Sequence, residues 1–274
     1  MAPKTDSSLA WPTDTIDDPY QVTAGVAAVR ATPTPDGEMV THALHGETLI
    51  LAKEDGDFAL VRLVSDGYVG WVDLETISTP PLPTTHRVNT LRTYVFSEPD
   101  FRSAPRFLIS MNGTVVVEKV EGAFSYCAKA GWVASVHLSP QGTFESSPAL
   151  VAERFLETPF LWGGKESLGL DGAGLVQVAH NACGLKIPRK PDMMWQKTGL
   201  AISEWQIPKS LHRGDLIFWD DHVGLMLDAE TVLHSSPHQM KVVSEPLLDA
   251  IQSLATTNGT PIGAKRIFEK KSGD

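Results

Sequence analysis

The chain has 274 residues, of which 42% are apolar and 20% charged, and its formal net charge at pH 7 is −10. This length predicts two or three domains, and the composition is that of a folded globular protein rather than a disordered one. The negative charge argues against nucleic acid and anionic membrane surfaces as partners, so we expect a small diffusing ligand.

Segments that target or anchor a protein are not evident. No apolar run approaches the roughly 18 residues of a membrane-spanning helix. The first 20 residues contain acids and prolines but no apolar core of a secretory signal. Two cysteines, Cys127 and Cys183, make no disulfide framework, and no Cys/His spacing resembles a zinc site. We therefore expect a cytoplasmic protein without metal or cofactor.

The N-terminal half predicts short β-strands. Residues 1–24 are predicted to form a polar arm. Residues 25–79 show β-like runs separated by turn signals such as Asp66-Gly67. The proline-rich segment 78–85 is predicted to be a stiff linker.

Residues 86–140 repeat the pattern of the first module. The run MNGTVVVEKVEGAF echoes LHGETLILAKEDGDF, and KAGWVASVHL echoes DGYVGWVDLETI. A repeat of about 60 residues with about five short strands predicts two small β-barrels. Trp71 and Trp132, one in each GWV triplet, are predicted to pack in the barrel cores.

Residues 146–270 predict an α+β domain, because helices come first and most strands follow. Ser147 is expected to cap a helix that starts at Pro148. The other expected elements are a helix after Asp171 that ends near Cys183, a short helix within 188–199, strands at 214–219, 222–227 and 231–236, a helix from Pro246 to about Ala255, and a strand at 261–268.

The stretch TPFLWGGKESLGLDGAGL (158–175) joins a glycine pair to a predicted helix start. Asp171 stands where a helix N-cap belongs, since its carboxylate can accept the first free amide hydrogens. A helix start is electropositive and would acidify a thiol. This chain has Gly172 and Ala173 there, neither of which carries a nucleophile.

Two histidines can form the acid–base pair that a cysteine nucleophile needs. His222 opens one predicted strand and His234 lies on the next. If the connecting loop centres on Ala229, both rings share one face and lie diagonally within reach. An even-length loop would put them on opposite faces. His238 is a lesser alternative to His234.

These motifs together resemble the NlpC-type cell-wall peptidases, papain-like cysteine enzymes whose nucleophile motif reads roughly TPYLWGG…G(F/I)DCSGL. RGDLIFW…HVGLML…TVLHSS is similar to the family's GDLVFF…HVGIYL…MIHAS. The two N-terminal modules resemble bacterial SH3-like domains. The resemblance places the family's cysteine on Gly172 and its serine on Ala173. It makes His222 the general base and His234 its orienting partner.

The resemblance also implies a ligand, a murein stem peptide with a free N-terminal L-Ala that relatives cut between γ-D-Glu and the diamino acid. Asp171 would accept the buried ammonium. Glu47 and Tyr68 of the first module resemble an acid and a phenol that family members direct into the cleft. Phe160 replaces the family's usual tyrosine, and Trp162 is expected to wall the pocket.

The expected function is therefore a murein-peptide γ-D-glutamyl-L-diamino acid endopeptidase of peptidoglycan recycling that lacks its nucleophile and is catalytically inactive. Cys183 lies roughly 16 Å further along the same predicted helix, and Cys127 belongs to the second module, so neither replaces the thiol. The alternatives are a pseudoenzyme that binds murein peptides without cutting them, and a structural protein that engages a partner through its SH3-like domains.

Overall fold

The computed structural model describes residues 9–207 and 209–267. The chain forms two units. Unit 1 contains the residues up to Thr143 together with the segment Trp162–Ser167, and unit 2 contains Phe144–Leu161 and the residues from Leu168 onward. The short segment 162–167, predicted as part of the C-terminal domain, thus has most of its contacts in the N-terminal unit.

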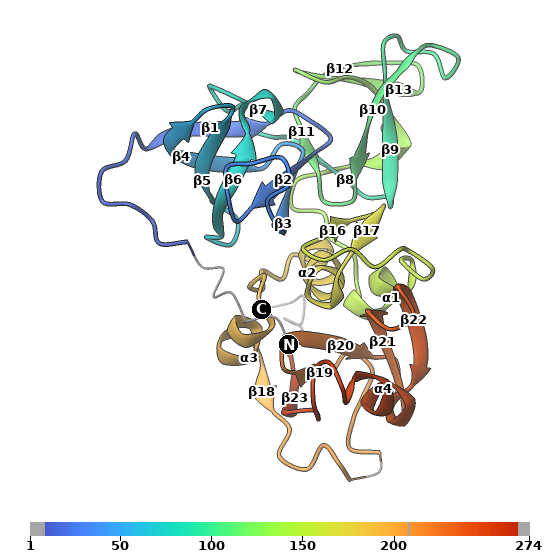
Figure 1. The fold of residues 1–274 in the computed structure, drawn as a ribbon. Helices are drawn as coiled ribbons and strands as arrows, with labels where there is room; N and C mark the ends of the chain where they lie inside the picture. Colours follow the sequence, from blue (N-terminus) through green and yellow to red (C-terminus); the bar gives the residue numbers. More distant parts are fainter. Residues whose placement is uncertain (1–8, 208, 268–274) are drawn as a thin grey trace. The chain divides into compact units, whose positions relative to one another are not determined.

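The first sheet of unit 1 has the strand order β3-β2-β6-β5-β4-β1-β7 (Figure 1). Apolar side chains at alternate positions, such as Ala27 and Val29, are buried on its inner face. Its strands are β1 (Asp18–Val22), β2 (Val26–Arg30), β3 (Met39–Leu44), β4 (Thr48–Asp55), β5 (Phe58–Leu63), β6 (Val69–Asp73) and β7 (Ile77–Ser78), and a 3₁₀ helix η1 (Leu74–Thr76) precedes β7.

The predicted N-terminal arm of residues 1–24 is too long. Residues 18–22 form β1, which pairs with β4 and β7. Val22 is buried in the core and Tyr20 packs against it. The run DPYQV is short and begins with two residues that disfavour strands, so its pairing depends on tertiary contacts that local propensity does not contain. Residues 1–8 of the arm lie outside the described part of the chain.

The second module repeats the first. Its main sheet has the order β10-β9-β14-β13-β12, which matches β3-β2-β6-β5-β4, and a second sheet has the order β11-β8-β15. The predicted repeat is therefore confirmed. The strands are β8 (His86–Val88), β9 (Arg92–Phe96), β10 (Pro105–Ser110), β11 (Thr114–Val115), β12 (Val117–Glu121), β13 (Phe124–Cys127), β14 (Gly131–Ala134) and β15 (Leu138–Pro140), with a 3₁₀ helix η2 (Ser135–His137).

The tryptophans of the two GWV triplets have the same environment. Trp71 is 6% exposed and Trp132 is 5% exposed. The ammonium of Lys53 lies 5.4 Å from the ring centroid of Trp71, and that of Lys119 lies 4.8 Å from that of Trp132. Each lysine follows a register shift in its strand. Both tryptophans therefore have the predicted packing role, and each has a cation on its ring face.

Unit 2 is built on a sheet of order β18-β23-β19-β20-β21-β22. The strands of unit 2 are β17 (Gly169–Leu170), which lies outside this sheet, and β18 (Leu200–Ala201), β19 (Leu216–Trp219), β20 (His222–Met226), β21 (Thr231–Ser236), β22 (Lys241–Pro246) and β23 (Gly263–Arg266). Its helices are α1 (Pro148–Glu153), α2 (Gly172–Ala182), α3 (Pro191–Lys197) and α4 (Leu247–Leu254). A further two-residue strand, β16 (Lys165–Glu166), belongs to unit 1.

Alternation along β19 separates two cores. Leu216 and Phe218 face α1, α2 and α3, whereas Ile217 and Trp219 face α4. A strand with both faces covered in this way consists of a continuous run of apolar residues, which explains the sequence LIFW. The order of elements confirms the predicted α+β class. Strand β22 was not predicted, because its run KVVSEP directly precedes a helix signal.

Candidate functional site

The site in unit 2 begins at the N-terminus of α2. Asp171 is the N-cap, in extended conformation with φ −91° and ψ 179°. The backbone N–H of Gly174 donates to its Oδ1 at 2.7 Å, as predicted for the cap. The helix that follows is buried along almost its whole length. It therefore places Gly172 at a fixed, water-poor position beside the sheet.

The carboxylate of Asp171 also holds a cation of the same chain. Arg189 donates to both oxygens, from Nη1 to Oδ1 at 3.0 Å and from Nη2 to Oδ2 at 2.6 Å. Its side chain is only 5% exposed, and that of Asp171 is 14% exposed. Such a two-point pair is among the stronger charge-assisted contacts. Arg189 was missed by the sequence analysis, although the basic run PRKP (188–191) was visible after the helix.

The two predicted histidines meet as expected. Leu225 pairs with Leu233 and Met226 with Val232, so the loop between β20 and β21 centres on Ala229. The Nε2 atom of His222 lies 2.9 Å from the Nδ1 atom of His234. The odd-length loop is thus confirmed. The alternative residue, His238, is exposed beyond the end of β21.

A carboxylate continues the contact. Glu245, on the unpredicted strand β22, has its Oε1 atom 2.8 Å from Nε2 of His234. An ionised carboxylate only accepts, so His234 donates its Nε2–H to Glu245 and accepts at Nδ1. His222 must then donate its own Nε2–H to His234. The chain of contacts therefore leaves the Nδ1 atom of His222 as a free base.

The charge state of His222 follows from its burial. Desolvation lowers the pKa of His222 well below its ordinary value of 6.5, and the positive charge that His234 can carry lowers it further. Only 4% of the residue is exposed. At neutral pH the ring is therefore neutral, with the basic Nδ1 lone pair that a nucleophile's general base requires.

That lone pair faces Gly172. A Cβ built on Gly172 would lie 2.9 Å from Nδ1 of His222, 2.7 Å from Cε1 of the same ring and 2.8 Å from the backbone oxygen of Val223. Distances under 3.0 Å leave no room for a side chain without movement. The imidazole thus fills the space in which a side chain at Gly172 would begin.

Two other predicted ligand residues of unit 2 lie apart from this chain of contacts. The methyl group of Ala173 is 4% exposed and packs in the core of α2 and β19. Its side chain lies on the core side of the helix, and the predicted ligand contact at this residue stays a prediction. Phe160 is half-buried, and its backbone N–H donates to the carbonyl of Met240.

The remaining predicted residues belong to unit 1. Glu47 accepts from the backbone N–H of Leu44 at 2.8 Å and forms an ion pair with Lys165. Tyr68 is half-buried against the core of the first module. Trp162 is 49% exposed, and its Nε1–H donates to Glu38 at 2.9 Å.

The turn after Trp162 explains the first glycine of the pair in the motif. Gly163 has φ +73°, and a Cβ there would lie 2.5 Å from the carbonyl oxygen of Met39. Both the left-handed conformation and the close approach of β3 require glycine. Gly163 of the WGG signature is thus required by the packing of segment 162–167 against the first module.

Comparison with known proteins identifies two domains. Residues 157–257 match the NlpC/P60 family, and residues 29–77 match the bacterial dipeptidyl-peptidase SH3 domain. An NlpC/P60 family protein from Bacillus cereus ATCC 10987 has a similar structure, with a TM-score of 0.75 and 16% identity over 92% of this chain and 100% of that chain. Residues 157–257 therefore form an NlpC/P60 domain, most of which lies in unit 2, and an SH3-like domain precedes it in the chain.

Two characterised relatives give the family context. Dipeptidyl-peptidase 6 of Lysinibacillus sphaericus is 32% identical over 100 residues, which is 36% of this chain and 35% of that protein. The chain thus matches about a third of that relative's length. Gamma-D-glutamyl-L-lysine dipeptidyl-peptidase of Bacillus subtilis (strain 168) is 26% identical over 225 residues, with 73% of each protein covered.

Within residues 9–207 and 209–267, His, Cys, Asp and Glu side chains form no group of three or more that could hold a metal ion. In the same part of the chain, no helix has the length and apolar character needed to cross a membrane. Cys127 is buried in the second module, where desolvation raises the pKa of its thiol to about 12. Cys183 follows the last residue of α2. Cys183 therefore lies at the opposite end of this helix from Gly172.

Proposed function

We propose that this NlpC/P60 protein binds murein-type peptides and does not hydrolyse them. The observation that carries the proposal is Gly172 at the start of α2, facing the basic Nδ1 of His222. Peptide hydrolysis by this constellation needs a thiolate whose proton the imidazole has taken. Glycine supplies neither a nucleophile nor a proton that the imidazole could remove, so the base has no group to activate.

The filled space beside Gly172 favours a binding protein over an enzyme whose only defect is the missing thiol. The ring of His222 and the carbonyl of Val223 both lie within 3.0 Å of the position of a Cβ at residue 172. Loss of the nucleophile from such a triad removes nearly all rate enhancement that depends on it. The chain of contacts from His222 through His234 to Glu245 would then serve the packing of the site.

The ligand class comes from the family. The Bacillus subtilis relative is named for a γ-D-glutamyl-L-lysine bond, and we assign to this chain a stem peptide of the same chemistry with a free N-terminal L-Ala. The proposed contacts are Asp171, the backbone at Ala173, Glu47, Tyr68, Phe160 and Trp162. A role in peptidoglycan recycling and a cytoplasmic location remain predictions.

The test combines binding and product analysis on one sample. The purified full chain is titrated calorimetrically with L-Ala-γ-D-Glu-L-Lys and with the diaminopimelate analogue, and the ligand is recovered and identified by mass spectrometry. We expect a binding isotherm and intact ligand. If neither peptide binds, the binding role is refuted. If L-Ala-γ-D-Glu is released, the chain hydrolyses the peptide and the second part of the proposal is refuted.

A further inference from the structure

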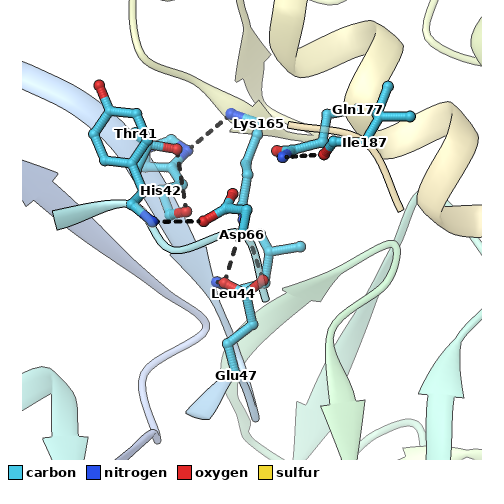
Figure 2. A network of polar contacts seen from close by, with 9 residues as sticks. Thr41, His42, Leu44, Glu47, Asp66, Lys165, Gln177 and Ile187 are labelled. Atoms are coloured by element: carbon cyan, nitrogen blue, oxygen red, sulfur yellow. Dashed lines mark hydrogen bonds and ion pairs between the residues drawn. The ribbon is translucent and has the colours of Figure 1, made fainter. Parts of the chain in front are cut away.

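Glu47 in unit 1 holds an ammonium that belongs to the chain itself. The Nζ atom of Lys165 lies 3.1 Å from Oε1 and 3.3 Å from Oε2 of this carboxylate (Figure 2). The side chain of Lys165 is 3% exposed and that of Glu47 is 15% exposed. Lysine is rarely buried to this extent without a partner, because an ammonium out of water needs a carboxylate beside it.

Both partners are fixed by further contacts. Oε2 of Glu47 accepts the backbone N–H of Leu44 at 2.8 Å, which orients the carboxylate from the β3–β4 turn. The backbone N–H of Lys165 donates to Nδ1 of His42 at 3.3 Å. The lysine is thus held by its main chain and its ammonium at once, both within unit 1 (Figure 2). A pair fixed at both ends loses little additional conformational entropy when it forms.

The contact has the chemistry of ligand recognition by an amine. The proposed function names Glu47 as a contact of the peptide, and an oriented, largely buried carboxylate of this kind suits a primary ammonium such as a peptide's N-terminus. One carboxylate with this hydrogen-bonding geometry satisfies one buried ammonium. The chain's own Lys165 and a ligand's N-terminus therefore compete for the same group.

We propose that Lys165 is a specificity-determining residue, an internal counter-ion that occupies Glu47 and removes selection for a free N-terminus. This inference rests on the proposed function, because it concerns how that peptide is recognised. In the unaltered chain a peptide gains nothing at Glu47 from its α-ammonium unless it displaces Lys165. Without Lys165 the carboxylate becomes an open ammonium site.

The first experiment compares L-Ala-γ-D-Glu-L-Lys with its N-acetylated form by calorimetric titration. The unaltered chain should bind the two within about threefold of each other, whereas Lys165→Met should prefer the free amine by about tenfold or more. Lys241→Met is the matched control, since Lys241 contacts both oxygens of Glu157 in an exposed pair. It should behave as the unaltered chain does. The inference would be overturned if the unaltered chain already preferred the free amine about tenfold and Lys165→Met did not increase that preference.

The second experiment does not depend on peptide binding. The melting temperature of full-length Lys165→Met is measured in ethylammonium chloride and in sodium chloride of equal concentration. Ethylammonium should raise it selectively, and the effect should vanish in the unaltered chain, in Lys241→Met and in the double variant Lys165→Met/Glu47→Gln. An equal response to both salts would overturn the inference. Rescue by ethylammonium without any peptide binding would refute the proposed function alone.

If Lys165→Met does not fold in sodium chloride, the same salts are compared during refolding. Recovery of folded chain in ethylammonium, and not in sodium chloride, supports the open ammonium site. Equal failure in both salts contradicts it, because a vacated carboxylate that accepts an ammonium should be stabilised by one.

Discussion

The imidazole of His222 occupies the place in which a side chain at Gly172 would start, with its Cε1 atom 2.7 Å and its Nδ1 atom 2.9 Å from an ideal Cβ there. A peptidase of this family needs a thiol between that helix start and that ring. In this chain the two are in direct contact, so the base is present without space for the nucleophile.

Gly172→Cys should destabilise the folded chain by about 1–3 kcal/mol, the usual cost of overpacking a buried site. The crowding includes the backbone oxygen of Val223, which cannot rotate away as a side chain can. We expect Gly172→Cys/Ala173→Ser to remain inactive on L-Ala-γ-D-Glu-L-Lys. Urea unfolding and product analysis measure the two effects.

The double variant Gly172→Cys/His222→Ala separates crowding from other consequences of the substitution. Removal of the ring should make the cost of Gly172→Cys smaller by at least about 0.5 kcal/mol, a coupling typical of residues in contact. Additive losses, or efficient cleavage by the Cys/Ser variant, would contradict a filled site.

Glu245 should stabilise the histidine pair through His234. Glu245→Ala leaves the Nε2–H of the buried His234 without this acceptor, so we expect a loss of about 1–3 kcal/mol in the free energy of unfolding. Glu245→Gln retains an amide oxygen and should lose less. Nitrogen-15 spectra of the imidazoles should show both rings as Nε2–H tautomers in the unaltered chain. Equal losses in the Ala and Gln variants would argue against an acceptor role.

The pair between Asp171 and Arg189 should be coupled strongly. Asp171→Ala removes the helix cap and leaves the guanidinium of a buried residue without its two-point carboxylate, for an expected loss of about 3–5 kcal/mol. The cap alone accounts for about 1 kcal/mol of this. Adding Arg189→Met should restore part of the stability, because the charge without its partner is then gone. Denaturant unfolding of the two single variants and the double variant measures the coupling, and simple additivity would contradict it.

Acid should destabilise the fold through buried imidazoles. Burial lowers the pKa of His45 and His222 below 6.5, and that of His180 to about 4, although the Nδ1–H that His180 donates to Val176 acts in the opposite direction. The unfolded chain takes up these protons as the pH falls below about 6.5, whereas the folded chain resists. Stability is therefore full above pH 6.5 and is lost as the pH falls toward the folded pKa values.

For His180 alone the loss between pH 6.5 and 4 amounts to about 3 kcal/mol. His180→Leu should therefore show a pH dependence of the unfolding free energy that is smaller by about one proton over this window. Urea unfolding at a series of pH values measures the slope. Identical slopes for the variant and the unaltered chain would show that this imidazole is not neutral in the folded state.

Sequence patterns predicted those features that depend on the spacing of residues close together in the chain. The glycine pair, Asp171 and the two strand histidines stand at fixed spacings, so the helix start was predicted from the sequence, whereas the odd loop centred on Ala229 was one of two alternatives. Glu245 was not, because its role needs β22 to be placed beside β21. Lys165 and Arg189 were missed for the same reason, since their carboxylate partners lie 118 and 18 residues away. Ion-pair partners at such separations have no periodic signal.

The closeness of His222 to Gly172 is tested most directly by nuclear Overhauser spectroscopy on the full chain at neutral pH. We predict a strong cross-peak between an α-proton of Gly172 and the Hε1 proton of His222, unchanged when peptide is added. Absence of this cross-peak from spectra that resolve both protons would mean that the ring leaves the space open, and the claim that imidazole has replaced the nucleophile would be wrong.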